Sequence, residues 1–300
     1  MKTESDATGR KWWRPEVPAY EGWALVVMRV LFAVLVFHMI KWETGPYIEQ
    51  KFPHGLARWV DLTWLSQHPP GLLWQGVTVA GLLFYAIGWA PLLGLTPALF
   101  FAISIGTLVT SQSKNVNHTW QMVTMMLLAQ WLVYAWEAAK KQGFLRPGKV
   151  WHRIASQASV VVIAASYVVC GIVKLVNSDF QWIQKVPLLS VQLLKSNWAN
   201  FYDTLQPPPA WLERATQLIV EYPNLARVFF GAGLLIELGA FVILISRRWA
   251  FWGGLCIVLL HVSISKVMQL NFENHIAAAL IFLVIPNTLA ALRRGDARAG

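Results

Sequence analysis

Long apolar runs dominate the chain, and they limit its fold more than any other feature of the sequence. An α-helix needs about 20 mostly apolar residues to cross about 30 Å of hydrocarbon. Runs close to this length recur through the sequence, separated by polar or proline-rich segments. We place these runs at residues 23–40, 71–93, 96–109, 118–138, 158–175, 225–246, 250–268 and 275–292. The sequence therefore predicts an all-α membrane bundle of about eight transmembrane helices, with further interfacial helices between them.

The composition supports a membrane location and excludes other classes of protein. Hydrophobic residues make up 56% of the chain and charged residues 13%, whereas soluble domains are usually less than half apolar. The 17 tryptophans fit the membrane interface, which indole side chains favour. The net charge of +10 is not gathered into a basic patch with interleaved aromatic residues, so we expect no nucleic-acid partner. Cys170 and Cys256 both fall in expected spans, so we expect no disulfide framework.

The distribution of basic residues predicts the orientation of the chain. Successive loops between the expected spans alternate between the two sides of the membrane. Lys and Arg are more numerous on the side that includes residues 1–20, 139–153 and 293–300 than on the other side. The positive-inside rule therefore places both termini in the cytoplasm. We expect residues 1–20 to form a basic cytoplasmic arm, residues 21–292 a single transmembrane domain and residues 293–300 a cytoplasmic tail. No signal peptide or organellar signal is apparent, which favours a multi-pass protein of the bacterial plasma membrane.

Two long connections are expected to lie at the noncytoplasmic interface. Residues 41–70 are too polar to span the bilayer and are rich in proline and aromatic residues. Residues 176–224 form the longest connection, and residues 188–205 within it have the pattern of an amphipathic interfacial helix. A connection of this length is usually functional.

Charged residues inside apolar runs are the first candidates for a site. Lys174 lies at the end of one run. Inserting a lysine into the hydrocarbon of a membrane costs about 2.5–3.5 kcal/mol of free energy. The alternative explanation is snorkelling, in which the stem is buried and the amine reaches the headgroups. Glu237 lies in the middle of another run and needs a cation or a proton. Because Arg29 also lies in a span, we predict a structural ion pair between Arg29 and Glu237.

Polar side chains at helical spacing accompany the lysine. Tyr167, Cys170, Gly171 and Lys174 share one helical face, and Gly171 allows another element to approach closely. In the predicted topology, several polar side chains of different spans fall in the noncytoplasmic half of the bilayer: His38, His118, Lys174, His261, Lys266 and His275. This clustering predicts a polar cavity that faces the noncytoplasmic side. The alternative is that these polar side chains only hold neighbouring helices together by hydrogen bonds. No metal-binding spacing such as HExxH occurs, so we expect no metal site.

Three short motifs resemble those of a known family. They are Tyr167-Val-Val-Cys-Gly-Ile-Val-Lys174-Leu175, Asp179-Phe-Gln-Trp182 and, upstream, Asn115-Val-Asn-His118. Together they are similar to motifs of the vitamin K-dependent γ-carboxylase family, whose wider group is called the horizontally transferred transmembrane domain. Glu237 and His261 resemble a glutamate and a histidine in later spans of that family. Two positions depart from the family pattern, because Cys170 stands for an alanine and Lys185 for a frequent glycine.

The resemblance implies an integral membrane enzyme that uses a reduced quinone of the vitamin K or menaquinol type. Lys174 would be the base that deprotonates the quinol, and His118 would position or stabilise the reacting groups. The quinol would then react with oxygen to form an epoxide, coupled to carboxylation or a related reaction. The residues implied to bind the substrate are Tyr167, Gly171, Asn117, Trp182, Met125 and His261. The chain has no counterpart of the soluble C-terminal region of the animal carboxylases, so we expect lipid rather than a protein as its partner.

Two other functions stay open at the level of the sequence. One is a noncatalytic membrane protein that binds a quinone or a lipid on the same scaffold. The other is a transporter, for which an internal repeat or paired broken helices would be typical. Neither of these signatures is found in the sequence, so the transporter ranks last.

Overall fold

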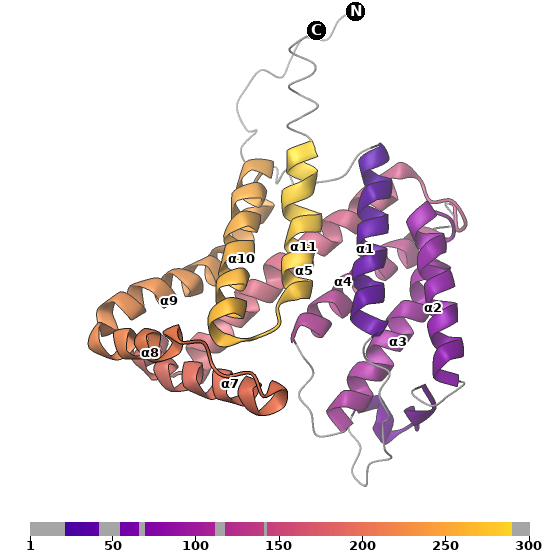
Figure 1. The fold of residues 1–300 in the computed structure, drawn as a ribbon. Helices are drawn as coiled ribbons and strands as arrows, with labels where there is room; N and C mark the ends of the chain where they lie inside the picture. The colour runs from indigo at the N-terminus through magenta and orange to yellow at the C-terminus, as the bar shows by residue number, and fades with distance from the viewer. Residues whose placement is uncertain (1–21, 42–54, 66–69, 112–117, 141–142, 290–300) are drawn as a thin grey trace, which may run out of the picture.

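The computed structural model describes residues 22–41, 55–65, 70–111, 118–140 and 143–289 (Figure 1). Every element in these ranges is a helix, and none of the described residues lies in a strand. The prediction of an all-α fold is therefore confirmed. The expected N-terminal arm, most of residues 41–70 and the expected tail lie outside the described residues.

The helices follow one another along the chain with short connections. The α-helices are α1 (Trp23–Lys41), α2 (Pro70–Ile87), α3 (Pro91–Ser111), α4 (His118–Ala139), α5 (Lys149–Asn177), α6 (Trp182–Lys185), α7 (Leu189–Thr204), α8 (Trp211–Glu221), α9 (Pro223–Leu238), α10 (Arg247–Met268) and α11 (Glu273–Ala279). Short 3-10 helices are η2 (Gly55–Arg58), η3 (Thr63–Leu65), η4 (Val186–Leu188) and η5 (Gly239–Leu244), and η6 (Leu280–Val284) is a π-helix. η5 prolongs α9, and η6 prolongs α11.

In the part of the chain that the structure describes, six helices are long and apolar enough to cross a membrane. They are Trp23–Ile40, Pro91–Val109, Trp120–Ala139, Lys149–Asn177, Pro223–Leu244 and Arg247–Met268. These helices support a multi-pass membrane protein. The other two expected spans coincide with the shorter apolar helices Gly71–Ile87 and Glu273–Leu289, so the count of eight is not confirmed. The start of α1 and the end of the α11 segment lie at the same end of the bundle (Figure 1).

The turn between α2 and α3 lies earlier in the chain than expected. The sequence predicts a turn between residues 93 and 96, whereas α2 ends at Ile87 and α3 begins at Pro91. Gly88 has a φ of 77°, in the left-handed region that glycine adopts without strain. Pro91 fits the first turn of α3, where its missing N–H leaves no hydrogen bond unmade. Pro97 lies inside α3.

Glycines bring α2 and α3 into close contact. A Cβ atom built at Gly94 would lie 2.6 Å from the carbonyl oxygen of Gly81, and one at Gly81 would lie 2.5 Å from that of Gly94. Either side chain would force the two backbones apart. Gly94, which the sequence interpretation placed in a turn, is therefore a packing residue of the α2–α3 pair.

α5 connects the two parts of the bundle. It packs against α4 on one side and against α9 and η5 on the other. It is longer than the expected span, because its helix begins at Lys149 within the segment predicted to be a basic loop. Its buried residues recur at steps of three and four: His152, Ala155, Ser156, Ser159, Val160, Ile163, Ala164, Tyr167 and Gly171. The same face of α5 is therefore buried from its first turns, which precede the apolar run, to its last.

The connection 176–224 folds into helices rather than into an open loop. The predicted helix 188–205 is confirmed as α7, and α8 follows it and packs against both α7 and α9 (Figure 1). The side-chain amide Nδ2 of Asn197 on α7 donates to the carbonyl oxygen of Val267 on α10 at 3.0 Å. This contact ties α7 to α10 at the end of the bundle where α5 ends.

Candidate functional site

The candidate site forms where α9 crosses α5. A Cβ atom at Gly171 of α5 would lie 2.8 Å from Cδ2 and 3.2 Å from the backbone nitrogen of Leu238. The absence of a side chain at Gly171 therefore allows α9 to approach α5, as the sequence predicts. Lys174 follows Gly171 by one helical turn, and Glu237 precedes Leu238. The close approach consequently brings the lysine and the glutamate together.

Lys174 and Glu237 form an ion pair with two hydrogen bonds. The Nζ of Lys174 donates to Oε1 and Oε2 of Glu237 at 2.5 and 2.6 Å. The Glu237 side chain is 7% exposed and that of Lys174 is 37% exposed. Each charge therefore neutralises the other inside an apolar surrounding, where an isolated ion would be costly.

The predicted ion pair between Arg29 and Glu237 is wrong. The Nε of Arg29 donates instead to the carbonyl oxygen of Ala86 at 3.1 Å. α1 packs chiefly against α2 and against α11 and η6, whereas Glu237 lies in the last turn of α9, which packs on α5. The order in which the helices pack thus gives Glu237 a lysine as its partner.

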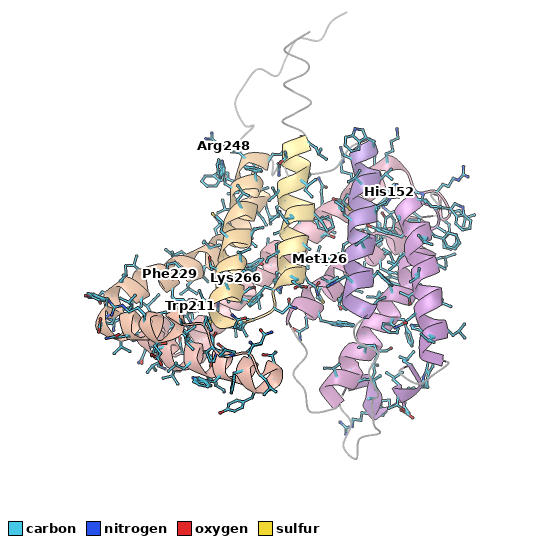
Figure 2. The ribbon with its side chains drawn as sticks, viewed as in Figure 1. Met126, His152, Trp211, Phe229, Arg248 and Lys266 are labelled. Carbon is cyan, nitrogen blue, oxygen red and sulfur yellow. The ribbon has the colours of Figure 1, made fainter. Side chains whose placement is uncertain are left out.

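An apolar cavity of about 300 Å³ lies between α9 and α10, beside the ion pair. Lys174, Glu237 and Ser263 supply charged or hydroxyl groups to its lining, and most of the remaining wall is apolar. Trp182 of α6 also lines the cavity, and the Nζ of Lys174 lies 5.9 Å from the centre of its ring, within cation–π range. Figure 2 shows Phe229, another lining residue, on α9.

Two aromatic rings and two histidines form a separate buried cluster next to this cavity. The hydroxyl of Tyr167 is hydrogen-bonded to Nε2 of His261 at 2.5 Å. The ring of His261 stacks on Phe272, with centroids 4.5 Å apart, and His275 lies edge-on to His261 at 5.0 Å. The cluster joins α5 to α10 and α11. Neither Tyr167 nor His261 lines the cavity, so the structure places them in helix packing beside it.

The other residues that the sequence proposed for the site have different locations. Met125 is half exposed on α4 and does not line the cavity. α4 begins at His118, but the side chain of His118, like all of Asn117, lies outside the described residues. Cys170 is exposed on α5. Among the described residues, no cluster of three His, Cys, Asp or Glu side chains is positioned to hold a metal ion.

The sequence analysis did not predict that side chains of α9 and α10 line a cavity beside Lys174. Phe229, Gly233 and Glu237 recur at steps of four on α9, and Leu260, Ser263 and Val267 at steps of three and four on α10. This spacing was visible in the sequence. Because lipid-facing helices carry the same apolar pattern, the spacing does not reveal that these two faces meet.

Comparison with known protein families, with curated proteins and with solved structures finds no match for this chain. The resemblance to the γ-carboxylases therefore depends on the quoted motifs alone.

The hydrogen bond between Tyr167 and His261 gives a prediction about stability. Tyr167→Phe removes the hydroxyl and leaves a buried ring nitrogen without this partner, so we expect the free energy of unfolding to fall by about 1–2 kcal/mol. Thermal melting in detergent measures the change. Tyr222→Phe is the matched control, because Tyr222 is exposed and should be neutral. Equal melting temperatures for the two variants would contradict a stabilising role of the bond.

Proposed function

We propose that this chain is an integral membrane enzyme that binds a reduced lipid quinone between α9 and α10 and deprotonates it with the Lys174–Glu237 pair. The observation that carries the proposal is an ion pair between a buried glutamate and a partly exposed lysine at the wall of an apolar cavity of about 300 Å³. Cavities that bind small molecules are usually apolar, with a few convergent polar groups. Titratable side chains that line such a cavity are candidates for the acid and the base of a reaction there.

The chemistry of a quinol matches the lining of the cavity. A quinol is a flat aromatic ring with a hydroxyl group at each end, and the larger lipid quinones carry an apolar tail. Trp182, Phe229 and Phe230 supply aromatic contacts for the ring. The cavity volume lies at the lower end of the range of about 300–1,000 Å³ typical of ligand sites, which suits a two-ring compound. A membrane bundle also gives a lipid substrate direct access.

The ion pair accepts one proton from the quinol. When the pair is ionised, the Glu237 carboxylate takes the proton, and the Lys174 ammonium stabilises the quinolate. When the proton of the pair already lies on Glu237, the neutral amine of Lys174 is the base, as the family resemblance implies. In both cases the pair changes from net neutral to +1 and the quinol to −1, so the charges balance. The quinolate then reacts with molecular oxygen, so that one oxygen atom enters the quinone epoxide and the other is released at the level of hydroxide. That base takes the proton of a carbon acid and ends as water, and CO2 adds to the carbanion that is formed.

The proposal includes a location and a topology. It places the protein in a bacterial plasma membrane with eight spans and with both termini in the cytoplasm. In this topology the end of α5 that carries Lys174 faces the noncytoplasmic side. The concentration of Lys and Arg in residues 1–20, 139–153 and 293–300 supports this orientation.

A second candidate function is noncatalytic binding of a quinone or lipid. One observation favours it, because both oxygens of the Glu237 carboxylate already accept hydrogen bonds from the Nζ of Lys174. A pair that keeps these two bonds would contact a quinone oxygen without removing a proton. Binding with no turnover is the result that this function predicts.

The proposal is tested by measuring quinone binding and epoxide formation in the wild type and in a variant whose cavity is filled by a larger side chain. Purified protein is incubated with a reduced naphthoquinone, oxygen and bicarbonate, and quinone epoxide is followed by chromatography. We expect the wild type to bind quinone and form epoxide. Ala232→Trp places an indole at an exposed position of the lining and should abolish both, whereas Ala165→Trp, exposed on α5 away from the cavity, should leave both unchanged.

The alternative outcomes separate the two candidate functions. Quinone binding without epoxide in the wild type would favour the noncatalytic function. Wild-type turnover in Ala232→Trp would show that the reaction does not use this cavity. A wild-type protein that binds no quinone would contradict the quinol reaction and noncatalytic quinone binding, and would leave only lipid binding.

A further inference from the structure

A second cavity lies at the opposite end of α5 and takes no part in the proposed reaction. Its volume is about 520 Å³, and it is lined by the start of α1, the turn after α2 and the start of α5. Lys149 begins α5 about 37 Å along the helix axis from Lys174, given a rise of about 1.5 Å per residue. Figure 2 shows His152 of this cavity far from Phe229 of the first one.

Basic side chains from two helices converge on this second cavity. Its charged or titratable lining residues are Arg29, Lys149, His152 and Arg153. Lys149 and Arg153 are exposed at its rim, whereas His152 is buried and hydrogen-bonded through Nδ1 to the hydroxyl of Tyr134 at 2.8 Å. None of the described residues that line the cavity is acidic. The cavity is therefore positively charged.

Arg29 is the deepest of these cations, and the described residues give it no acidic partner. The residue is 5% exposed, and Nε donates to the carbonyl oxygen of Ala86. Within the described part of the chain, no carboxylate lies within 4 Å of its guanidinium, and Glu137 accepts instead from the backbone N–H of Gly148 at 3.2 Å. A buried charge without a counter-ion is costly, so an anion that enters the cavity would be stabilised.

The backbone leaves room for this guanidinium. A Cβ atom at Gly88 would lie 2.9 Å from Nη2 and 3.0 Å from Cζ of Arg29. Because Gly88 also has a φ of 77°, a side chain is excluded there on two grounds. The forked N–H groups of a guanidinium match the paired oxygens of a phosphate.

From these contacts we propose that the cavity binds a phosphate group on Arg29, with Lys149 and Arg153 at its rim. The group has two sources, the headgroup of an anionic phospholipid and a free phosphate ion. Apolar surface next to the cavity favours the lipid, because Trp23, Val26 and Val150 line it and are exposed. Val30 and Val34 continue this exposed stripe down α1 at steps of four, where an acyl chain can lie.

The location of the cavity agrees with a lipid source. The basic residues of the sequence predict that this end of the bundle is cytoplasmic, and anionic lipids are concentrated in the cytoplasmic leaflet. The site is independent of the proposed quinol reaction, since it shares no lining residue with the first cavity.

The test measures binding of three probes to the purified full chain in a neutral detergent. They are a short-chain phosphatidylglycerol, the matching phosphatidylcholine and inorganic phosphate, each titrated by calorimetry. We expect phosphatidylglycerol to bind more tightly than phosphatidylcholine. Arg29→Gln should weaken this binding about tenfold or more, as expected when hydrogen bonds to a charged group are lost. Arg248→Gln is the matched control, because Arg248 is exposed at the same end of the bundle and lies outside the cavity (Figure 2).

The outcomes identify the source of the phosphate or overturn the site. Tight phosphatidylglycerol binding that depends on Arg29 identifies a lipid headgroup, and phosphate binding alone with the same dependence identifies a free ion. Equal affinity for both lipids, no phosphate binding and no difference between Arg29→Gln and Arg248→Gln would overturn the proposal. If Arg29→Gln does not fold, the double variant Lys149→Gln, Arg153→Gln at the exposed rim replaces it. Wild-type phosphatidylglycerol affinity in that double variant would equally overturn the proposal.

Discussion

Replacing Lys174 with alanine is expected to slow quinol epoxidation by a factor of about 10²–10⁴, the usual contribution of a positioned acid or base. The variant removes both the amine that can accept the proton and the ammonium that stabilises the quinolate. Quinone binding should persist, because the aromatic walls at Trp182 and Phe229 are unchanged. Chromatography of the epoxide, beside a quinone-binding titration, measures both effects. Lys266→Ala is the matched control, since Lys266 is an exposed lysine of α10 outside the cavity lining (Figure 2).

A second variant separates the chemistry of the pair from its structural role. Lys174→Ala also leaves the Glu237 carboxylate without its cation, which destabilises a fully buried pair by about 3–5 kcal/mol and a partly exposed one by less. The double variant Lys174→Met, Glu237→Leu removes both charges. We expect its thermal stability to be close to that of the wild type, because the double variant leaves no charge without a partner at this site. Epoxide formation by this folded double variant would exclude the pair as the proton acceptor.

The sequence predicted the type of structure and most helix positions because apolar periodicity is local. The expected spans at residues 23–40, 118–138 and 250–268 coincide closely with α1, α4 and α10. The sequence also singled out Lys174, as a charge in an apolar run. Each of these inferences needs only the residues of one segment.

The partner of Glu237 was not predictable in the same way. A mid-span carboxylate requires a cation, but the sequence does not state which helix packs beside it. Arg29 and Lys174 satisfied the chemical requirement equally well. The decisive signal was Gly171, because a small residue one turn before Lys174 indicates that another backbone approaches α5 there. The sequence contained this signal but did not identify α9 as the approaching helix.

The cavities depend on angles between helices, which no single segment encodes. α9 diverges from α10 (Figure 1), and this divergence leaves the space beside the ion pair. The basic cavity likewise requires the turn at Gly88 to face the first turn of α5. Lys149 and Arg153 were interpreted as loop residues that set the topology. Only the longer α5 brings them next to Arg29.

Gly171→Ala is expected to destabilise the protein by about 1–3 kcal/mol, the usual cost of an added methyl group in a packed core. The new Cβ atom would lie 2.8 and 2.9 Å from Cδ2 and Cγ of Leu238, so α9 must move away from α5. Glu237 precedes Leu238 in the chain and moves with it, which lengthens its hydrogen bonds to Lys174. We therefore expect a lower melting temperature together with slower epoxide formation.

Two further variants determine whether the close approach at Gly171 holds the pair in place. Gly76→Ala adds the same methyl group to α2 where no atom lies within 4 Å, so it should be neutral or stabilising by up to about 1 kcal/mol. Leu238→Ala removes Cγ and Cδ2 and should recover part of the turnover of Gly171→Ala. The recovery should be incomplete, because the added Cβ still lies 3.2 Å from the backbone nitrogen of residue 238. If Gly171→Ala instead behaves like Gly76→Ala in melting and turnover, the geometry of the pair does not depend on this crossing, and the ion pair alone must hold α9 against α5.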